Sequence, residues 1–303
     1  MPTLYKLTTK CVARVMQTLV ERRNLLAENQ MGCVRFVEAA KEQVLTDKVL
    51  AMAYKHQLKV SWVDVKKAYD SIDHAYLLEC IDALGLPSWI IRFLRDTVQR
   101  WKIELRDGKD IILEKPIRRG ILQGDSLSPL LFVLCLDPMS RMLTSKFPQL
   151  TIETDAGTLC SNHLLFVDDL KLISTDSKVA GTMMAAVSEF FGAIGLDINY
   201  NKSATNEPMC ADGAKFIHGT ETYKYLGIVQ DSAGRLTPET FERVRAKLIE
   251  RVEKLCLSKL NGRNLIHAIN EYAISLVNYY IGIIDLEPKV FAELDHDVRQ
   301  VLI

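Results

Sequence analysis

The sequence predicts an α+β fold, with helices packed around a small and mainly antiparallel sheet. Two segments rich in β-branched and aromatic residues, 58–64 and 163–173, read as strands, and each carries acidic residues at a strand end or in a turn. Longer segments with apolar residues at helical spacing alternate with them, and after residue 233 only the helical pattern continues. A chain of 303 residues is long enough for a sizeable core and two or three subdomains.

The composition is that of an ordinary globular protein, with 48% hydrophobic and 25% charged residues. No apolar run is long enough to span a bilayer and no secretory signal is present, so we expect an intracellular protein without a membrane partner. The seven cysteines form no CxxC pair, which favours reduced core thiols over a zinc site or disulfides. A formal charge of zero argues against a nucleic-acid protein, although basic residues gather near the C-terminus.

The first half of the chain contains several helix boundaries and one hairpin. Residues up to about 55 carry apolar side chains at helical spacing, interrupted by the segment 28–32. A helix capped near Asp73 is expected to stop at Gly85, and another begins near Ser88. Two short β-rich runs flank Asp107 and Gly108, which predicts a hairpin.

The second half is mostly helical outside the strands. Residues 127–143 predict a buried helix in which Pro138 introduces a kink or break. An amphipathic helix is expected to end at Gly195, another to begin at Thr237 and Pro238, and a further one near Asn264.

Three carboxylates are the strongest chemical signal. Asp168 and Asp169 lie between two strand-forming runs, in a predicted hairpin turn, and Asp64 follows a predicted strand. Adjacent anions are tolerated if one is protonated or if a divalent cation lies between them. An all-oxygen donor set suits two Mg²⁺ or Mn²⁺ ions, one activating a hydroxyl and the other stabilising a leaving oxygen. A solvated Asp-Asp turn is the alternative.

Several motifs resemble those of reverse transcriptases. Residues 118–132 resemble the Gln-Gly template and nucleotide segment, and 166–169 the aromatic-X-Asp-Asp signature, with Val167 where many relatives have Ala. Residues 195–203 and 223–228 resemble the next motif and the primer-grip turn, and 28–32 the Asn-Gln-X-Gly turn of the fingers. The resemblance is strongest to non-long-terminal-repeat retrotransposon (LINE-like or R2-like) enzymes and looser to group II intron reverse transcriptases.

The resemblance implies a polymerase right-hand fold. Residues 1–57 would form partial fingers, 58–233 the palm with finger elements at about 88–118, and 234–303 a partial helical thumb. The family's Arg-Pro-Ile segment would precede residue 2, so we expect the chain alone to bind template-primer weakly and to extend primers poorly.

The resemblance also assigns roles to individual residues. Asp64, Asp168 and Asp169 would be the catalytic metal ligands, and Lys202 would assist departure of pyrophosphate. Tyr69 would exclude a ribose 2′-hydroxyl, although a lone aromatic residue is more often core. The remaining substrate-binding candidates are Arg118, Arg119, Gln123, Gly124 and Phe166. The candidates for nucleic-acid binding are Arg243, Arg245, Lys247 and Arg251, with an ordinary salt-bridged helix face as the alternative.

The expected activity is that of an RNA-directed DNA polymerase from a retrotransposon. It would use an RNA template, a DNA or RNA primer and deoxynucleoside triphosphates, beside flanking domains of a larger polyprotein, in the nucleus if the source is eukaryotic. An RNA-templated RNA polymerase is a second hypothesis, against which Tyr69 argues. A catalytically impaired or domesticated fragment that serves as a nucleic-acid-binding or scaffold domain is a third.

Overall fold

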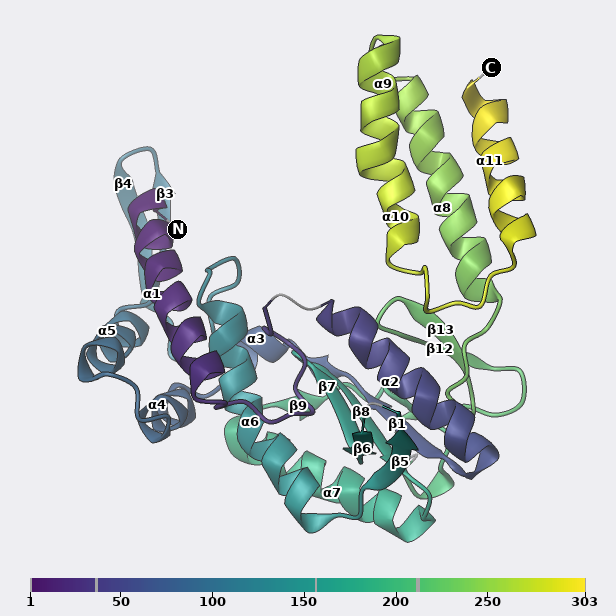
Figure 1. The fold of residues 1–303 in the computed structure, drawn as a ribbon. Coiled ribbons are helices and arrows are strands. Elements are labelled where there is room, and N and C mark those ends of the chain that lie inside the picture. Colours follow the sequence, from purple (N-terminus) through teal and green to yellow (C-terminus); the bar gives the residue numbers. More distant parts are fainter. Residues whose placement is uncertain (1, 36–37, 156, 211–212, 303) are drawn as a thin grey trace.

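The computed structural model describes residues 2–35, 38–155, 157–210 and 213–302 and confirms the α+β class. A five-stranded sheet with the order β11–β10–β1–β8–β7 lies at the centre (Figure 1). All its neighbouring strands are antiparallel except β10 and β11. The strands of this sheet are β1 (Lys59–Val63), β7 (His163–Phe166), β8 (Asp169–Ser174), β10 (Ala204–Thr205) and β11 (Lys215–Phe216).

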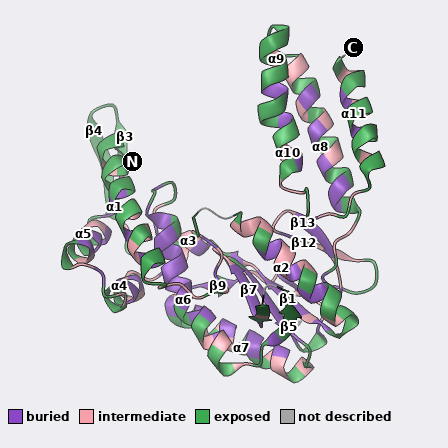
Figure 2. Cartoon of the chain, viewed as in Figure 1, coloured by how far each residue is buried: buried purple, intermediate pink, exposed green. Residues whose placement is uncertain are grey.

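Helices cover both faces of the sheet, and side chains of β8 therefore alternate between two cores. Leu170 and Leu172 pack in the core that includes α6 and α7, whereas Ile173 packs with Leu50 of α2 on the other face. Figure 2 shows buried residues along the strands and on the facing sides of these helices. The covering helices are α2 (Ala39–Tyr54), α6 (Ser128–Lys146) and α7 (Ser177–Ile194).

Helix α6 continues through Pro138, so of the kink or break predicted at this residue the break does not occur. Proline removes one hydrogen bond to the carbonyl four residues earlier. The helix is buried along most of its length, and we attribute its continuity to this burial, which outweighs one lost hydrogen bond.

The N-terminal helical group stands to one side of the sheet (Figure 1). Asp73 caps α4 as predicted, because its Oδ1 accepts hydrogen bonds from the backbone N–H groups of Ala75 and Tyr76. The predicted hairpin pairs Asp107 with Asp110 across its turn. The elements of this group are α1 (Thr3–Arg22), α3 (Ala68–Ser71), α4 (His74–Ala83), α5 (Ser88–Gln99), β3 (Lys102–Asp107) and β4 (Asp110–Pro116).

The C-terminal helices form a separate group with a core of their own, built around Leu248, Val252 and Ala273. They stand above the other side of the sheet in Figure 1. Pro238 precedes the first of these helices, as the sequence predicted. The group consists of α8 (Glu239–Cys256), α9 (Gly262–Ile269), the π-helical segment η3 (Asn270–Ile274), α10 (Ser275–Asn278) and α11 (Pro288–Leu302).

Small two-stranded sheets and single helical turns complete the described chain. They are β2 (Val65–Lys66) with β9 (Asp197–Ile198), β5 (Leu150–Thr154) with β6 (Gly157–Ser161), β12 (Thr222–Tyr225) with β13 (Ile228–Asp231), and the 3₁₀ turns η1 (Lys55–Gln57) and η2 (Pro208–Cys210).

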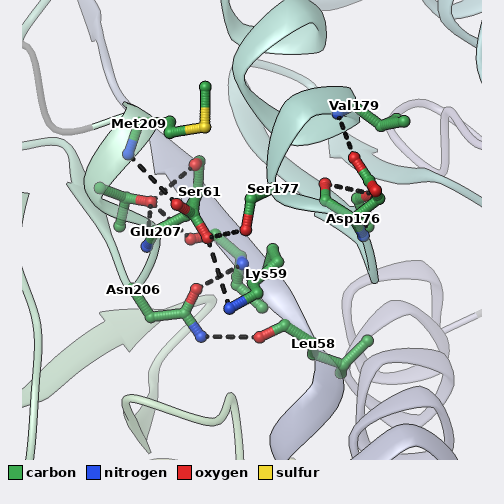
Figure 3. A network of polar contacts seen from close by, with 12 residues as sticks. Leu58, Lys59, Ser61, Asp176, Ser177, Val179, Asn206, Glu207 and Met209 are labelled. Atoms are coloured by element: carbon green, nitrogen blue, oxygen red, sulfur yellow. Dashed lines mark hydrogen bonds and ion pairs between the residues drawn. The ribbon is translucent and has the colours of Figure 1, made fainter.

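A polar network fixes the beginning of β1, the strand that precedes Asp64 (Figure 3). The buried carboxylate of Glu207 accepts hydrogen bonds from Ser177 Oγ at 2.8 Å and from the backbone N–H of Met209, and lies 3.4 Å from Lys59 Nζ. The Asn206 side chain accepts from the N–H of Val60 at 2.7 Å. These contacts join β1, β10 and the start of α7, so both the position and the register of β1 are fixed.

The prediction of core thiols is correct for part of the chain only. None of the seven cysteines, all of which lie in the described ranges, forms a disulfide, and Cys80, Cys135 and Cys210 are buried. Cys11 and Cys160 are exposed, which contradicts the prediction for these two. Cys11 lies on the exposed side of the amphipathic helix α1, and Cys160 on the exposed hairpin β5–β6, where neither face is fully covered. No helix in the described ranges is long and apolar enough to cross a membrane.

Candidate active site

The acidic pair lies in a tight hairpin turn, as the sequence predicted. Strands β7 and β8 pair Phe166 with Asp169, which leaves Val167 and Asp168 as a two-residue turn. Val167 has a φ of +57°, in the left-handed region, whereas the φ of Asp168 is not positive. A positive φ at the first central residue only is the pattern of a type II′ turn, a position that glycine usually occupies. A β-branched residue is strained there.

Asp64 is brought to the same end of the sheet by strand pairing. β1 lies antiparallel beside β8, with Val63 opposite Leu170, so the next residue, Asp64, lies level with Asp169. The Asp64 carboxylate accepts a hydrogen bond from Asn199 Nδ2 at 2.8 Å, and the Asp64 carbonyl accepts from the N–H of Asn199. Sequence reasoning noted the segment that contains Asn199 but gave this residue no role. Its distance of 135 positions from Asp64 leaves no local signal.

Burial and neighbouring charges raise the pKa values of Asp168 and Asp169. Burial, followed by the charges of Asp168 and Asp64, raises the pKa of Asp169 to about 6 although part of this side chain is exposed. Burial also raises the pKa of Asp168, and Asp64 adds to that effect. In the described part of the chain, no three His, Cys, Asp or Glu side chains are arranged as a ready ion site. The donor set nevertheless fits a hard cation, because it offers only oxygen atoms and its charges repel one another.

An open pocket of about 770 Å³ is lined by Asp64 and Asp168, whereas Asp169 is not part of its lining. It brings together five predicted site residues, namely Asp64, Tyr69, Gln123, Asp168 and Lys202. Lys66 and Lys67 also line it, and sequence reasoning assigned them no role. Both are exposed and lie two and three residues after Asp64, so the pocket has basic groups beside its acidic end.

Tyr69 is held at this pocket by aromatic packing. Its ring stacks on Phe132 of α6, with centroids 4.7 Å apart and an interplanar angle of 20°. Burial and the nearby charge of Asp168 raise the pKa of Tyr69 to about 12, so its hydroxyl stays protonated at neutral pH. The Tyr69 side chain is therefore half-buried: it packs against Phe132 and also lines the pocket. Gln123 is exposed, with its Nε2 at 3.4 Å from Asp70 Oδ1.

Tyr223, in the predicted primer-grip motif, lies beside the carboxylates. Its ring stacks on Trp62 of β1 at 5.1 Å, and its hydroxyl donates to the carbonyl of Lys202 at 3.0 Å. Burial and the charges of Asp64 and Asp169 raise its pKa to about 12. The hairpin β12–β13 is thereby placed next to the acidic end of the sheet.

Other predicted residues do not line this pocket. Arg118 and Gly124 are exposed elsewhere, and Arg119 Nη2 lies 3.4 Å from the carbonyl of Gly195. Phe166 borders a different pocket, of about 410 Å³, together with Tyr279 of the C-terminal part. Substrate contacts of these four residues remain predictions.

Three of the four basic candidates of α8 make polar contacts within the chain. Arg243 pairs with Glu239 one turn earlier, and Arg245 Nη2 lies 2.6 Å from Asp297 Oδ2 of α11. Arg251 Nη1 donates to the carbonyl of Tyr272. Arg243 and Arg245 therefore match the alternative interpretation of an ordinary salt-bridged helix face. Binding of nucleic acid by this helix remains a prediction.

The fold and the acidic turn together define the palm of a nucleotide polymerase. A family model described as reverse transcriptase (RNA-dependent DNA polymerase) matches residues 1–229. The chain belongs to this family, as the motifs predicted.

Similar proteins come from retrotransposons. The chain is 25% identical over 289 residues to the Retrovirus-related Pol polyprotein from type-2 retrotransposable element R2DM of Drosophila melanogaster, covering 89% of this chain and 26% of that protein. It is 27% identical over 199 residues to the Pol polyprotein from type-1 retrotransposable element R2 of Popillia japonica, covering 60% of this chain and 32% of that protein. The chain thus spans about a quarter to a third of these relatives.

Solved structures of telomerases share the fold. Telomerase from Candida albicans, in complex with a fragment of telomeric RNA, aligns with a TM-score of 0.55 and 13% identity, over 96% of this chain and 52% of that one. Apo telomerase from Candida tropicalis aligns with a TM-score of 0.56 and 13% identity, over 97% of this chain and 54% of that one. At this identity the likeness establishes the right-hand polymerase fold alone.

Proposed function

We propose that this chain is the polymerase part of a retrotransposon reverse transcriptase, which copies an RNA template by adding deoxynucleotides to a primer 3′-hydroxyl. The observation that carries the proposal is the position of Asp64. Strand pairing sets it level with the Asp168–Asp169 turn, at a pocket that also contains Tyr69, Gln123 and Lys202. Membership of the reverse transcriptase family supports a polymerase site here over a solvated acidic turn.

Asp64, Asp168 and Asp169 are the residues that would hold two divalent ions, Mg²⁺ or Mn²⁺, the class of cofactor that reverse transcriptases use. When bound, the ions supply charge neutralisation at the reacting phosphate and activation of the primer hydroxyl. The chain's own residues position the substrates. Asn199 holds the Asp64 carboxylate, Tyr69 lines the pocket where the sugar would lie, and Lys66, Lys67 and Lys202 would offer positive charge to the triphosphate.

The wider organisation belongs to the same proposal. Residues 1–57 would act as part of the fingers, 58–233 as the palm and 234–303 as the beginning of the thumb, within a larger polyprotein. The template would be RNA and the primer DNA or RNA. The protein would act inside the cell, and in the nucleus if the host is eukaryotic. The separate core of the C-terminal helices supports a thumb that moves as a unit.

The test combines ion binding with primer extension. Asp168→Asn with Asp169→Asn is expected to abolish Mn²⁺ binding, followed by electron paramagnetic resonance, and all extension on an RNA template. Asp110→Asn, on the exposed hairpin strand β4, serves as the matched control and should retain both. Unchanged Mn²⁺ binding in the double variant, with a folded protein, would refute the assignment of the acidic turn.

A further inference from the structure

The turn that carries Asp168 is braced by a segment from the other end of the sequence. Residues 29–31 run along β7, the edge strand of the sheet. The N–H of Leu165 donates to the carbonyl of Asn29 at 3.1 Å, and the N–H of Met31 donates to the carbonyl of Leu165 at 2.9 Å. Gln30 and Leu165 thus form a parallel bridge, which ends two residues before Val167.

The side chain of Gln30 then reaches the strained residue itself. Its Oε1 accepts from the backbone N–H of Val167 at 3.1 Å, and its Nε2 lies 3.4 Å from the carbonyl of Val167. Oε1 also accepts from the N–H of Gly32 at 2.8 Å, which fixes the amide. Gln30 is only 1% exposed, so water does not compete for these hydrogen bonds.

Gly32 allows this close approach. A Cβ atom at this position would lie 2.7 Å from Val167 N and 2.8 Å from Val167 Cγ2, distances that real Cβ atoms do not show. Asn29 anchors the other side of the segment, because its side chain accepts from Ser161 Oγ at 3.1 Å and donates to Thr144 Oγ1 at 3.2 Å. The brace is therefore built from several independent contacts.

We propose that Gln30 is a positioning residue, whose carboxamide holds Val167 in its left-handed conformation and thereby sets the direction of the Asp168 and Asp169 carboxylates. A β-branched residue leaves a positive φ unless its surroundings hold it there. Both backbone polar groups of Val167 face the same amide, which fixes the peptide planes on either side of it. The catalytic consequence rests on the proposed polymerase function, whereas the structural one does not.

The decisive experiment is rescue in the full chain. Gln30→Met keeps the length of the side chain and removes its hydrogen bonds. We expect Mn²⁺ binding to weaken roughly tenfold and primer extension to fall by about tenfold or more, since a displacement near 1 Å at a reacting group costs up to about 100-fold in rate. Val167→Gly removes the conformational strain, because glycine adopts a positive φ without a clash. Combining it with Gln30→Met should restore most of the Mn²⁺ affinity.

A buried polar residue on a strand that does not adjoin β7 supplies the control. Thr205 of β10 is also 1% exposed, and its hydroxyl donates to the carbonyl of Val60 at 2.9 Å. Thr205→Val should show no rescue by Val167→Gly. Should Gln30→Met alone fail to fold, the comparison of Val167→Gly with the Gln30→Met and Val167→Gly double variant decides the question. If these two variants bind Mn²⁺ with affinities equal within about twofold, the proposal is supported, and if the double variant binds about tenfold more weakly than Val167→Gly, it is overturned.

Other outcomes separate this proposal from the proposed function. A folded Gln30→Met variant that binds Mn²⁺ as tightly as the wild type overturns the positioning role. A wild-type chain that binds Mn²⁺ through its acidic turn but extends no primer overturns the polymerase function only, and ion binding still decides the role of Gln30.

Discussion

Lys171 and Asp47 form a buried ion pair whose disruption should be costly. Lys171 Nζ lies 2.6 Å and 2.7 Å from the two Asp47 carboxylate oxygens, and both side chains are 1% exposed. Gln230 completes the group, because its Oε1 accepts from Lys171 at 3.0 Å and its Nε2 donates to Asp47 at 2.6 Å. The pair joins β8, α2 and β13 on the face of the sheet that α2 covers.

Replacing Lys171 with Met leaves the Asp47 carboxylate buried, with Gln230 as its hydrogen-bond partner but no positive charge. Removing one partner of such a pair costs about 3–5 kcal/mol of unfolding free energy. Adding Asp47→Asn removes the second charge but keeps an oxygen that can accept from Gln230. The double variant should therefore recover about 2 kcal/mol or more relative to the sum of the single changes.

Urea unfolding followed by tryptophan fluorescence measures these quantities. Trp62 reports on the site directly, since Lys171 Nζ lies 5.0 Å from its ring centroid. Lys215→Met is the matched control, because the Lys215 side chain is 54% exposed and its surface ion pair contributes at most about 1 kcal/mol. A loss below about 1 kcal/mol in Lys171→Met, or strictly additive single changes, would refute the reasoning.

Further predictions concern sugar selection, pH and the basic helix. Tyr69→Ala should raise the incorporation of ribonucleotides relative to deoxynucleotides, whereas Tyr69→Phe should not, and equal ratios in competitive extension assays would return Tyr69 to a packing role. Burial lowers the pKa of His163 to about 3, so the unfolded chain binds one more proton than the folded chain between about pH 3 and 6.5. The free energy of unfolding should therefore rise with pH in this range by up to about 1.4 kcal/mol per pH unit. Urea unfolding of His163→Gln should show a smaller dependence of this free energy on pH, and an unchanged dependence would contradict the prediction. Lys247→Gln should weaken the binding of a template-primer duplex and reduce the salt dependence of that binding. Arg245→Gln should mainly lower thermal stability, because it breaks the ion pair with Asp297. Both expectations would be contradicted if filter binding showed the larger loss for Arg245→Gln and thermal melting the larger loss for Lys247→Gln.

Local signals sufficed for the acidic turn and for the strand that leads to Asp64. Strand-forming residues on both sides of Asp168 and Asp169 leave little choice but a hairpin, and the structure has it. Asp73 as a helix cap and the hairpin at Gly108 follow from equally local rules. In each case the residues that decide the structure are close together in the sequence.

Contacts between distant segments were beyond this reasoning. Lys171 alternates with Leu170 and Leu172, a pattern that predicts a solvent-facing lysine, yet α2 covers that face and supplies Asp47 from 124 positions away. The roles of Gln30 and Asn199 depend in the same way on strand neighbours that no spacing rule identifies. Pro138 failed as a helix breaker because burial of α6 outweighs one hydrogen bond.

The acidic turn combines two unfavourable features, a β-branched residue at positive φ and two carboxyl groups whose pKa is raised by burial and by neighbouring charges. Such features persist only where the surroundings determine the backbone in more than one way. Here the Gln30 segment holds the turn at the edge strand, Asn199 holds Asp64 across the sheet, and the Lys171–Asp47 pair ties β8 to α2 two residues after Asp169. Each restraint comes from a different element, so the geometry of the carboxylates depends on the whole sheet being assembled. A substitution that removes any one restraint should therefore change the geometry of the site at a smaller loss of stability than is needed to unfold the chain.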